Sequence, residues 1–254
     1  MLTLVADYHT HSNLSDGKAE LEANVEAAVE RGLKRMAATE HGPRHMLSGI
    51  KADALVELRK RIDRINQHYQ GKIEVLLGLE ANLIGLDGEL DVPAQAQGRL
   101  DILLMGFHRS APGRRWQDKR IFQFQRKSRK ESTAQMVQRV ATQAILRSLE
   151  RYPIGILVHP CHHLSVDLLT LGPACVQTHT AIEISDRKGH LKFDVETARR
   201  LKQMGVSFVL DTDGHAPQEI GRWHQALVFA EQAGLTAQDV INAEGYAGAL
   251  PKPF

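Results

Sequence analysis

The sequence lacks the features that mark secreted, membrane-spanning and thiolate-metal proteins. Its 254 residues include only two cysteines, Cys161 and Cys175, which are too few for a disulfide framework and lack the paired spacing of a thiolate zinc site. No window approaches the roughly 18 apolar residues of a membrane span, and the opening MLTLVAD reaches an aspartate too early for a secretory signal. We therefore expect a cytoplasmic protein that does not enter a membrane and that binds any metal ion through histidines and carboxylates.

Low-complexity linkers and convincing internal repeats are also absent, which indicates a single domain over residues 1–254. Short apolar runs instead alternate with amphipathic stretches. The predicted strands are 2–7, 33–39, 73–80, 100–108, 154–160, 180–185 and 206–213. The predicted helices are 19–32, about 55–69, 132–150, 164–177, 193–204 and 217–233. This alternation, with strands that are apolar nearly throughout, predicts an α/β fold with a parallel sheet, either closed as a barrel or open and doubly wound.

Histidines and carboxylates gather where the predicted strands end. Asp7, His9 and His11 alternate along the first strand, so their side chains share one face. One His-x-His pair is weak evidence for a metal, because such a pair is often only a polar strand end. The other strand ends add Glu40, His41, Glu80, His108, His159, Asp213 and His215. Six of the 13 histidines then lie at the edge where both candidate folds bind ligands, which predicts a metal site there.

The motifs around these residues resemble those of the polymerase and histidinol phosphatase (PHP) domain family of metal-dependent phosphoesterases, over the whole chain. They read DYHTHS with SDG, TEHG, GLEAN, GFH, HP and TDGHAPQEIG, in the family's order. The resemblance implies a distorted (β/α)7 TIM-like barrel with up to three metal ions at its carboxyl-terminal face. Amidohydrolase barrels also begin with His-x-His, but they usually end in a lone aspartate, so the final DTDGH favours the PHP family.

The resemblance also implies a set of nine metal ligands. The first ion would be held by His9, His11, Glu80 and Asp213, the second by Glu80, His108 and His159, and the third by Asp16, His41 and His215. Glu80 would bridge two ions about 3.5 Å apart. Because imidazole and carboxylate ligands suit Zn, Mn or Fe, we expect two to three divalent transition metal ions. Asp7 has two equally good roles, either orienting a ligand histidine or stabilising the strand end.

The implied chemistry is hydrolysis of a phosphate ester through a metal-bridging hydroxide. Its expected catalytic residues are Glu80, Asp213 and Arg187. Arg187 follows the sixth strand, where its planar donors would suit a phosphate, although a surface pair with Asp186 is an equal alternative. The candidate substrate-binding residues are Arg187, Arg44, His45 and Arg109. Of the remaining histidines, His162 and His163 could line the rim of the site. We expect the others at the surface or in helices, and they are His68, His179, His190 and His224.

Residues 109–131, RSAPGRRWQDKRIFQFQRKSRKE, form a basic insertion relative to a compact family member. The segment holds nine Lys or Arg against Asp118 and Glu131, a local charge of +7 in a chain whose formal net charge is +2. With Trp116, Phe122 and Phe124 it could bind single-stranded nucleic acid by charge and base stacking. The alternative is a helix whose basic face is only solvated.

Three functions therefore remain open. The first is a phosphatase or phosphodiesterase acting on a small phosphorylated metabolite or nucleotide. The second is a nuclease, such as a 5′–3′ exonuclease, that uses the same metal ions and the basic segment. The third, a non-catalytic module stabilised by metal, is disfavoured because all nine expected ligands are present and the chain shows no partner domain. The sequence leaves the substrate, the metal and the oligomeric state open.

Overall fold

The structure is a computed structural model that describes residues 2–116, 118, 131–248 and 254. The strands are β1 (Ala6–Thr10), β2 (Arg35–His41), β3 (Glu74–Asn82), β4 (Ile102–Gly106), β5 (Ile156–Leu157), β6 (Ala181–Ser185) and β7 (Phe208–Asp211). The helices are α1 (Leu21–Glu30), α2 (Ala52–His68), the short 3-10 helix η1 (Ala94–Ala96), α4 (Glu131–Arg151), α5 (Leu168–Thr178), α6 (Val195–Gln203) and α7 (Gln225–Ala233).

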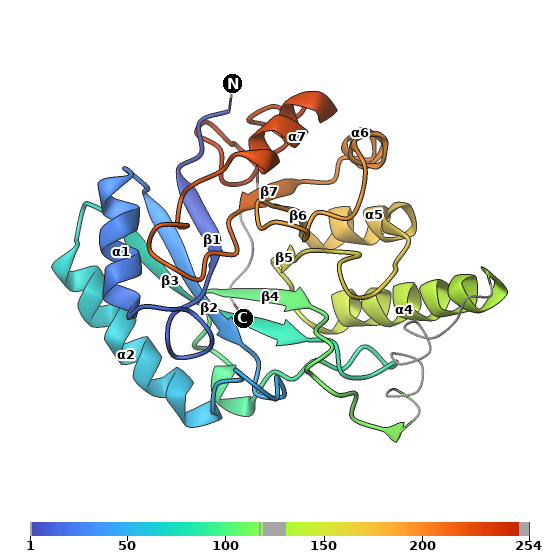
Figure 1. The fold of residues 1–254 in the computed structure, drawn as a ribbon, viewed down its shortest axis with the longest axis horizontal. Coiled ribbons are helices and arrows are strands. Elements are labelled where there is room, and N and C mark those ends of the chain that lie inside the picture. The colour runs from blue at the N-terminus through green and yellow to red at the C-terminus, as the bar shows by residue number, and fades with distance from the viewer. Residues whose placement is uncertain (1, 117, 119–130, 249–253) are drawn as a thin grey trace.

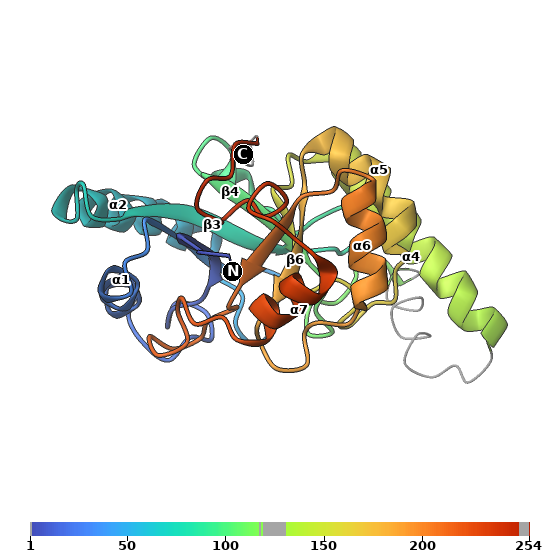
Figure 2. The same cartoon turned by 90° about the horizontal axis from the view of Figure 1, so that it is seen from above.

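The strands form one parallel sheet in sequence order, β1 to β7, which curls into a nearly closed barrel. Helices α1 and α2 lie on one side of it, and α4, α5 and α6 lie together on the other (Figures 1 and 2). One apolar cluster packs between the sheet and the helices, while a smaller cluster that includes Tyr8, Leu104 and Val209 fills the barrel interior. The structure therefore confirms the distorted (β/α)7 barrel.

The barrel closes between its first and last strands largely through side chains. A parallel bridge joins Thr10 to Gly214, and the Tyr8 amide donates to Asp211 Oδ1 at 2.7 Å. Asp7 Oδ2 accepts the Thr212 hydroxyl at 2.6 Å and the Gly221 amide at 2.9 Å. Of the two roles considered for Asp7, these contacts match the stabilisation of the strand end.

Local sequence explains where the helices lie. Helix α2 buries Leu55, Leu58, Ile62 and Ile65, which recur every three or four residues along one face. Helix α5 begins after Asp167, whose carboxylate accepts the amides of Leu169 and Thr170, and it ends at His179 in the left-handed conformation. Within the described ranges, no helix is both long enough and apolar enough to cross a membrane.

Each predicted strand and helix has a counterpart, but several ends differ. Strand β1 runs from Ala6 to Thr10 instead of over 2–7, and β5 keeps only two of the seven predicted residues. Helix α7 begins at Gln225, so the prediction of helix from 217 was wrong. Gly221 has φ +66°, which a right-handed helix does not allow. Most of the basic segment, residues 117 and 119–130 with Phe122 and Phe124, lies outside the described residues.

Candidate metal centre

Glu80 is the centre of the cluster at the carboxyl-terminal end of the barrel. It lies fully buried near the end of β3. Its Oε1 is 2.8 Å from His159 Nε2 and 3.2 Å from His108 Nε2. Its Oε2 is 2.7 Å from His41 Nδ1 and 3.6 Å from His9 Nε2. The two carboxylate oxygens thus face two different sets of imidazoles.

A second buried carboxylate, Asp213, follows β7 and faces the His-x-His pair of β1. Its Oδ1 is 3.4 Å from His11 Nε2 and 3.7 Å from His9 Nε2. Asp213 has φ +49° and His159 has φ +29°. Non-glycine residues adopt such angles at a cost in conformational energy, and strained residues of this kind recur at functional sites.

Asp16 gathers the third group at the open side of the cluster. Its Oδ1 is 3.2 Å from His215 Nε2, and its Oδ2 is 3.2 Å from His41 Nε2. The ring of His11 lies between these two histidines, with centroids 4.5 Å from His41 and 4.4 Å from His215. The Asp16 side chain is 39% exposed, so this group opens to solvent.

The donor atoms fit a divalent transition metal. Four sets of side chains have ligand atoms within 4.8 Å of one another, and they are His11, Asp16, His41 and His215; His9, His11 and Glu80; His9, His159 and Asp213; and His41, Glu80 and His108. The buried atoms Glu80 Oε2 and His41 Nδ1 lie 2.7 Å apart without the geometry of a hydrogen bond. Buried polar atoms are costly unless they are satisfied, and a cation that both atoms coordinate would satisfy them. All nine predicted ligands belong to these four sets. The sets do not coincide with the three groups of ligands that were predicted for three ions.

The charges in the cluster act on one another. Burial would lower the pKa of His9, but the carboxylates of Asp213 and Glu183 raise it well above its usual value. Burial, together with the neighbouring His41 and His215, lowers the pKa of His11 to about 3. Burial would raise the pKa of Glu80, yet the surrounding histidines hold it well below its usual range. Without a metal ion, these shifts favour an ionised Glu80 and a neutral His11, as metal binding requires, whereas the raised pKa of His9 favours a proton that a metal ion would have to displace.

Two of the predicted ligand histidines are oriented by buried partners that the sequence analysis missed. His9 Nδ1 donates to Glu183 Oε1 at 2.7 Å, and His108 Nδ1 donates to Asn82 Oδ1 at 2.7 Å. With Nδ1 bound to these partners, Nε2 of each ring faces Glu80. Glu183 is the one charged residue in the apolar strand AIEIS, and this was a signal that could have identified it.

Asp91 forms hydrogen bonds with Asn82, the partner of His108, and with the loop after β2. Its carboxylate accepts the Asn82 amide at 2.6 Å, the Asn82 side-chain Nδ2 at 2.8 Å and the Arg44 amide at 2.9 Å. A Cβ at Gly42 would lie 2.3 Å from Asp91 Oδ1, so the close approach of this loop requires glycine there. Arg44 thus contacts Asp91 through its backbone amide. Its side-chain Nη2 lies 3.5 Å from the Pro112 carbonyl oxygen.

Of the predicted substrate contacts, Arg187 lies nearest to the cluster. Its Nη1 donates to the Asp213 carbonyl at 2.8 Å and lies 2.6 Å from His215 Nδ1. Asp186 instead accepts the backbone amides of His224 and Ala226. These contacts therefore do not support the alternative, a surface ion pair between Arg187 and Asp186.

The other predicted contacts differ in exposure, and His45 is buried beside the cluster. His45 stacks on His41 with centroids 4.3 Å apart, and its Nδ1 is 2.6 Å from the Ser48 hydroxyl. Burial, together with His41, lowers the pKa of His45 to about 4. Arg109 is exposed. Burial, together with the charge of Arg109, lowers the pKa of His163 to about 4.

His190 also belongs to the site, so its expected place at the surface or in a helix was wrong. Its Nδ1 is 2.8 Å from Asp213 Oδ2, and its ring centroid is 4.0 Å from that of His162. The turn after β6 brings it there, since the His190 amide donates to the Arg187 carbonyl at 3.0 Å. From the sequence alone, this residue could only be placed shortly after a strand end.

A barrel of parallel strands with a buried histidine and carboxylate cluster at their carboxyl ends defines the class of barrel metalloenzymes. Within this class, the PHP domain matches residues 7–164, which is more than half of the chain. The chain belongs to the PHP domain family, as the motif resemblance predicted.

Individual relatives are distant but cover nearly the whole chain. A probable phosphatase of Thermoanaerobacter sp. (strain X514) is 26% identical over 252 residues, covering 96% of this chain and 92% of the relative. Another probable phosphatase, from Shewanella loihica, is 27% identical over 245 residues, covering 94% and 85%. Among solved structures, histidinol phosphate phosphatase from Lactococcus lactis subsp. lactis Il1403, complexed with zinc, L-histidinol and phosphate, has TM-score 0.62 and 18% identity, covering 91% of this chain and 94% of that chain.

Proposed function

We propose that this metal-dependent phosphoesterase hydrolyses the phosphate ester of a small phosphorylated molecule, using two to three divalent transition metal ions (Zn, Mn or Fe). The observation that carries the proposal is the position of Glu80, whose two buried oxygens face separate sets of imidazoles. Relatives named probable phosphatases, and a fold shared with a phosphatase that was solved with zinc and phosphate, support the same chemistry.

We assign the metal ligands as the sequence analysis expected. His9, His11 and Asp213 would hold one ion together with Glu80, and His108 and His159 would share Glu80 at a second. The third ion would be held by Asp16, His41 and His215. The close approach of these donor atoms supports the assignment. When bound, the ions supply Lewis-acid charge and activate the attacking water.

The chain's own residues position the substrate and the ligands. Glu183 and Asn82 hold the rings of His9 and His108 with Nε2 facing the site. We assign Arg187, which donates to the Asp213 carbonyl, to the phosphate oxygens, which its guanidinium donors would bind. We assign His45, which stacks on His41, and the exposed Arg109 to contacts with the leaving group.

The described contacts favour a small substrate over a nucleic acid strand. Arg114 Nη1 is 2.6 Å from Glu89 Oε2, and Arg115 Nη2 is 3.2 Å from Asp87 Oδ2. Two cations of the basic segment are therefore already paired with carboxylates of the barrel. Less of the segment's charge is left to contact the phosphates of a strand.

The test combines metal analysis with a substrate panel. Purified protein should contain two to three equivalents of transition metal, and a chelator should lower both its melting temperature and its activity. Hydrolysis should be measured on phosphomonoesters, nucleotides and short oligonucleotides with Mn, Zn and Mg. Restoring metal to the chelated protein should restore phosphomonoester hydrolysis. Protein that neither contains nor takes up metal, or that hydrolyses no phosphate ester with metal bound, would refute the proposal.

A further inference from the structure

A cationic pocket adjoins the metal centre, and the proposed chemistry does not use most of it. This pocket, of about 450 Å³, is lined by residues that include Arg187, Lys188, Arg222 and His224. We propose that it is a second anion-binding subsite, which receives another phosphate or a carboxylate of a substrate whose scissile phosphate lies at the metal centre. The inference rests on the proposed function and narrows its substrate class to esters that carry a second anionic group.

Arg187 links the pocket to the metal centre. Its Nη1 donates to the Asp213 carbonyl and its Nε is 3.8 Å from Asp213 Oδ2, so one side of the guanidinium contacts the cluster. The same residue lines the cationic pocket. A substrate held by Arg187 therefore has the pocket directly beside it.

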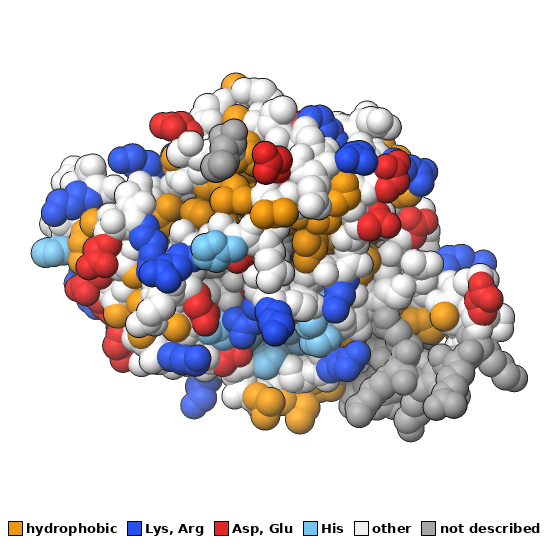
Figure 3. Space-filling view, turned by 45° about the horizontal axis from the view of Figure 1, so that its top comes forward, with side chains coloured by type: hydrophobic (Ala, Val, Ile, Leu, Met, Phe, Trp, Pro, Cys, Tyr) orange, Lys and Arg blue, Asp and Glu red, His pale blue; other side chains and the backbone are white. Residues whose placement is uncertain are grey.

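The positive charge of the pocket is available to a ligand. Among the described residues, no ion pair is formed by Lys188 or Arg222, and both side chains belong to exposed residues. Figure 3 shows Lys and Arg side chains next to histidine side chains across the middle of one face of the molecule. Free guanidinium and ammonium groups around a hollow of this size are the donors that phosphates and carboxylates prefer.

The two carboxylates of the pocket are already engaged by the backbone. Asp186 Oδ1 accepts the amides of His224 and Ala226, each at 2.8 Å. Glu219 Oε2 accepts the His215 amide at 2.8 Å. Neither carboxylate has an ion pair with a cation of the pocket in the described part of the chain. Lys188 and Arg222 are therefore left to pair with an incoming anion, whereas Arg187 Nε is 3.8 Å from Asp213 Oδ2.

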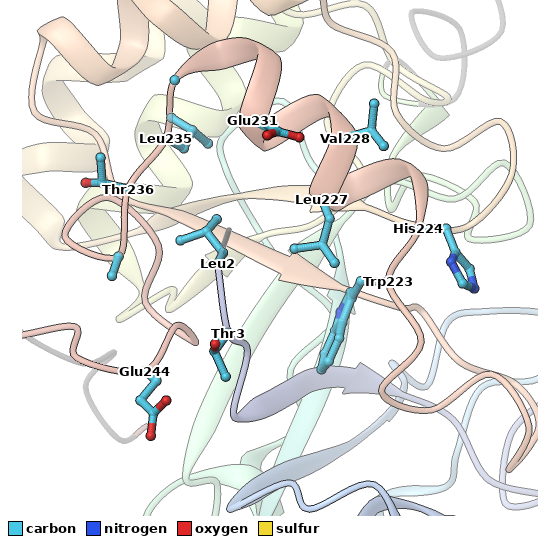
Figure 4. Close-up of a pocket in the computed structure, with 12 residues that line it drawn as sticks. Leu2, Thr3, Trp223, His224, Leu227, Val228, Glu231, Leu235, Thr236 and Glu244 are labelled. Atoms are coloured by element: carbon cyan, nitrogen blue, oxygen red, sulfur yellow. The ribbon is translucent and has the colours of Figure 1, made fainter.

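A neighbouring groove differs in chemistry and is not part of this subsite. It measures about 830 Å³ and lies between α7 and the amino-terminal segment, with Leu2, Leu227 and Leu235 among its apolar residues (Figure 4). Its charged residues are Glu231 and Glu244, which would repel an anion. His224 lies at its edge and also lines the cationic pocket.

The first test compares substrates that differ in their second anionic group. Glycerol 3-phosphate, 3-phosphoglycerate and 2,3-bisphosphoglycerate would be assayed with wild type and with the double variant Lys188→Gln, Arg222→Gln. The variant should raise KM for the two glycerate esters about 10- to 100-fold, as expected for the loss of charge-assisted hydrogen bonds. The kcat/KM for glycerol 3-phosphate should stay unchanged. The matched control is Lys72→Gln, Arg200→Gln, two exposed cations outside the pocket.

The second test measures anion binding without metal. Inorganic phosphate titrated into chelated protein should bind to wild type and to the control variant in calorimetry, and binding should be lost in the Lys188→Gln, Arg222→Gln variant. Phosphate binding that survives these changes, or a wild type with no preference for the glycerate esters, would overturn the subsite. A wild type that binds phosphate in this pocket but hydrolyses no ester would instead overturn the proposed function and leave the subsite standing.

Discussion

His9 of β1 and Glu183 of β6 form a buried hydrogen bond of 2.7 Å across the barrel, between strands that are not neighbours in the sheet. Glu183 also accepts the backbone amide of His159, so one carboxylate supports two proposed ligands. Its charge helps to raise the pKa of His9. A carboxylate in this position makes the imidazole a better donor to a metal ion.

The first prediction follows from this bond. Glu183→Gln should lower metal affinity about 10- to 100-fold, since the amide keeps an acceptor for His9 but loses the charge and places a donor near the His159 amide. Metal content after dialysis and a metal titration of activity would measure the effect. The control is Glu196→Gln, an exposed carboxylate of α6. Equal metal affinity in both variants would show that Glu183 has no orienting role.

The second prediction concerns the two kinds of carboxylate ligand. Glu80→Gln should abolish most activity and reduce the bound metal, because both of its buried oxygens face imidazoles of the cluster. Asp16→Asn should have a milder effect, because Asp16 contacts only the third group and its side chain is 39% exposed. Steady-state kinetics with elemental analysis of each variant would test the order. Similar, mild losses in both would contradict a bridging Glu80.

The third prediction concerns the amino-terminal cap of α5. Asp167→Ala should destabilise the protein by about 1 kcal/mol, because Asp167 Oδ1 is 3.1 Å from the Leu169 amide and 3.3 Å from the Thr170 amide. The hydrogen bond from the Thr170 hydroxyl, together with those from the backbone amides of Thr170 and Leu169, lowers the pKa of Asp167. The charge-dependent part of the stabilisation should thus be present above an unfolded pKa of about 4 and should disappear as the pH falls through the lower folded pKa.

Asp167→Asn is the matched control for this cap, since asparagine caps helices as well but does not titrate. Denaturant unfolding between acidic and neutral pH would give the free energy of unfolding of wild type and of Asp167→Asn. The difference between these two free energies should contain a part that depends on pH and a small constant part. A difference that does not change with pH would mean that the charge of Asp167 has no part in the cap.

The fourth prediction separates the small-molecule and nuclease hypotheses. The combined change of Arg114, Arg115, Arg126 and Lys127 to Gln should leave phosphomonoester turnover unchanged, since Arg114 and Arg115 pair with carboxylates of the barrel and not with the metal centre. If the segment bound a strand, oligonucleotide affinity would fall, and its salt slope would become shallower by about 0.7 for each lost phosphate contact. Such a change would restore the nuclease hypothesis.

From the residues alone, the sequence predicted a parallel α/β fold with histidines and carboxylates at one edge, because parallel strands bring their carboxyl ends together there. The closed (β/α)7 barrel and the full set of nine ligands, including Asp16, came from the resemblance to the PHP family. Neither source identified the residues whose role depends on contacts across the barrel. Glu183 acts on His9 from a strand 174 positions away. His190 reaches Asp213 only through the turn after β6. Helix α7 was predicted too long because periodicity does not reveal the positive φ of Gly221.

The junction of β1 and β7 lies beside the proposed metal ligands. This junction relies on one bridge and on side-chain bonds such as those of Asp7 with Thr212, where other strand pairs share longer ladders. His9 and His11 lie at the end of the first strand, and Asp213 follows the last strand, so an ion bound by all three would link the two edges of the sheet. Metal binding would then be coupled to closure of the barrel.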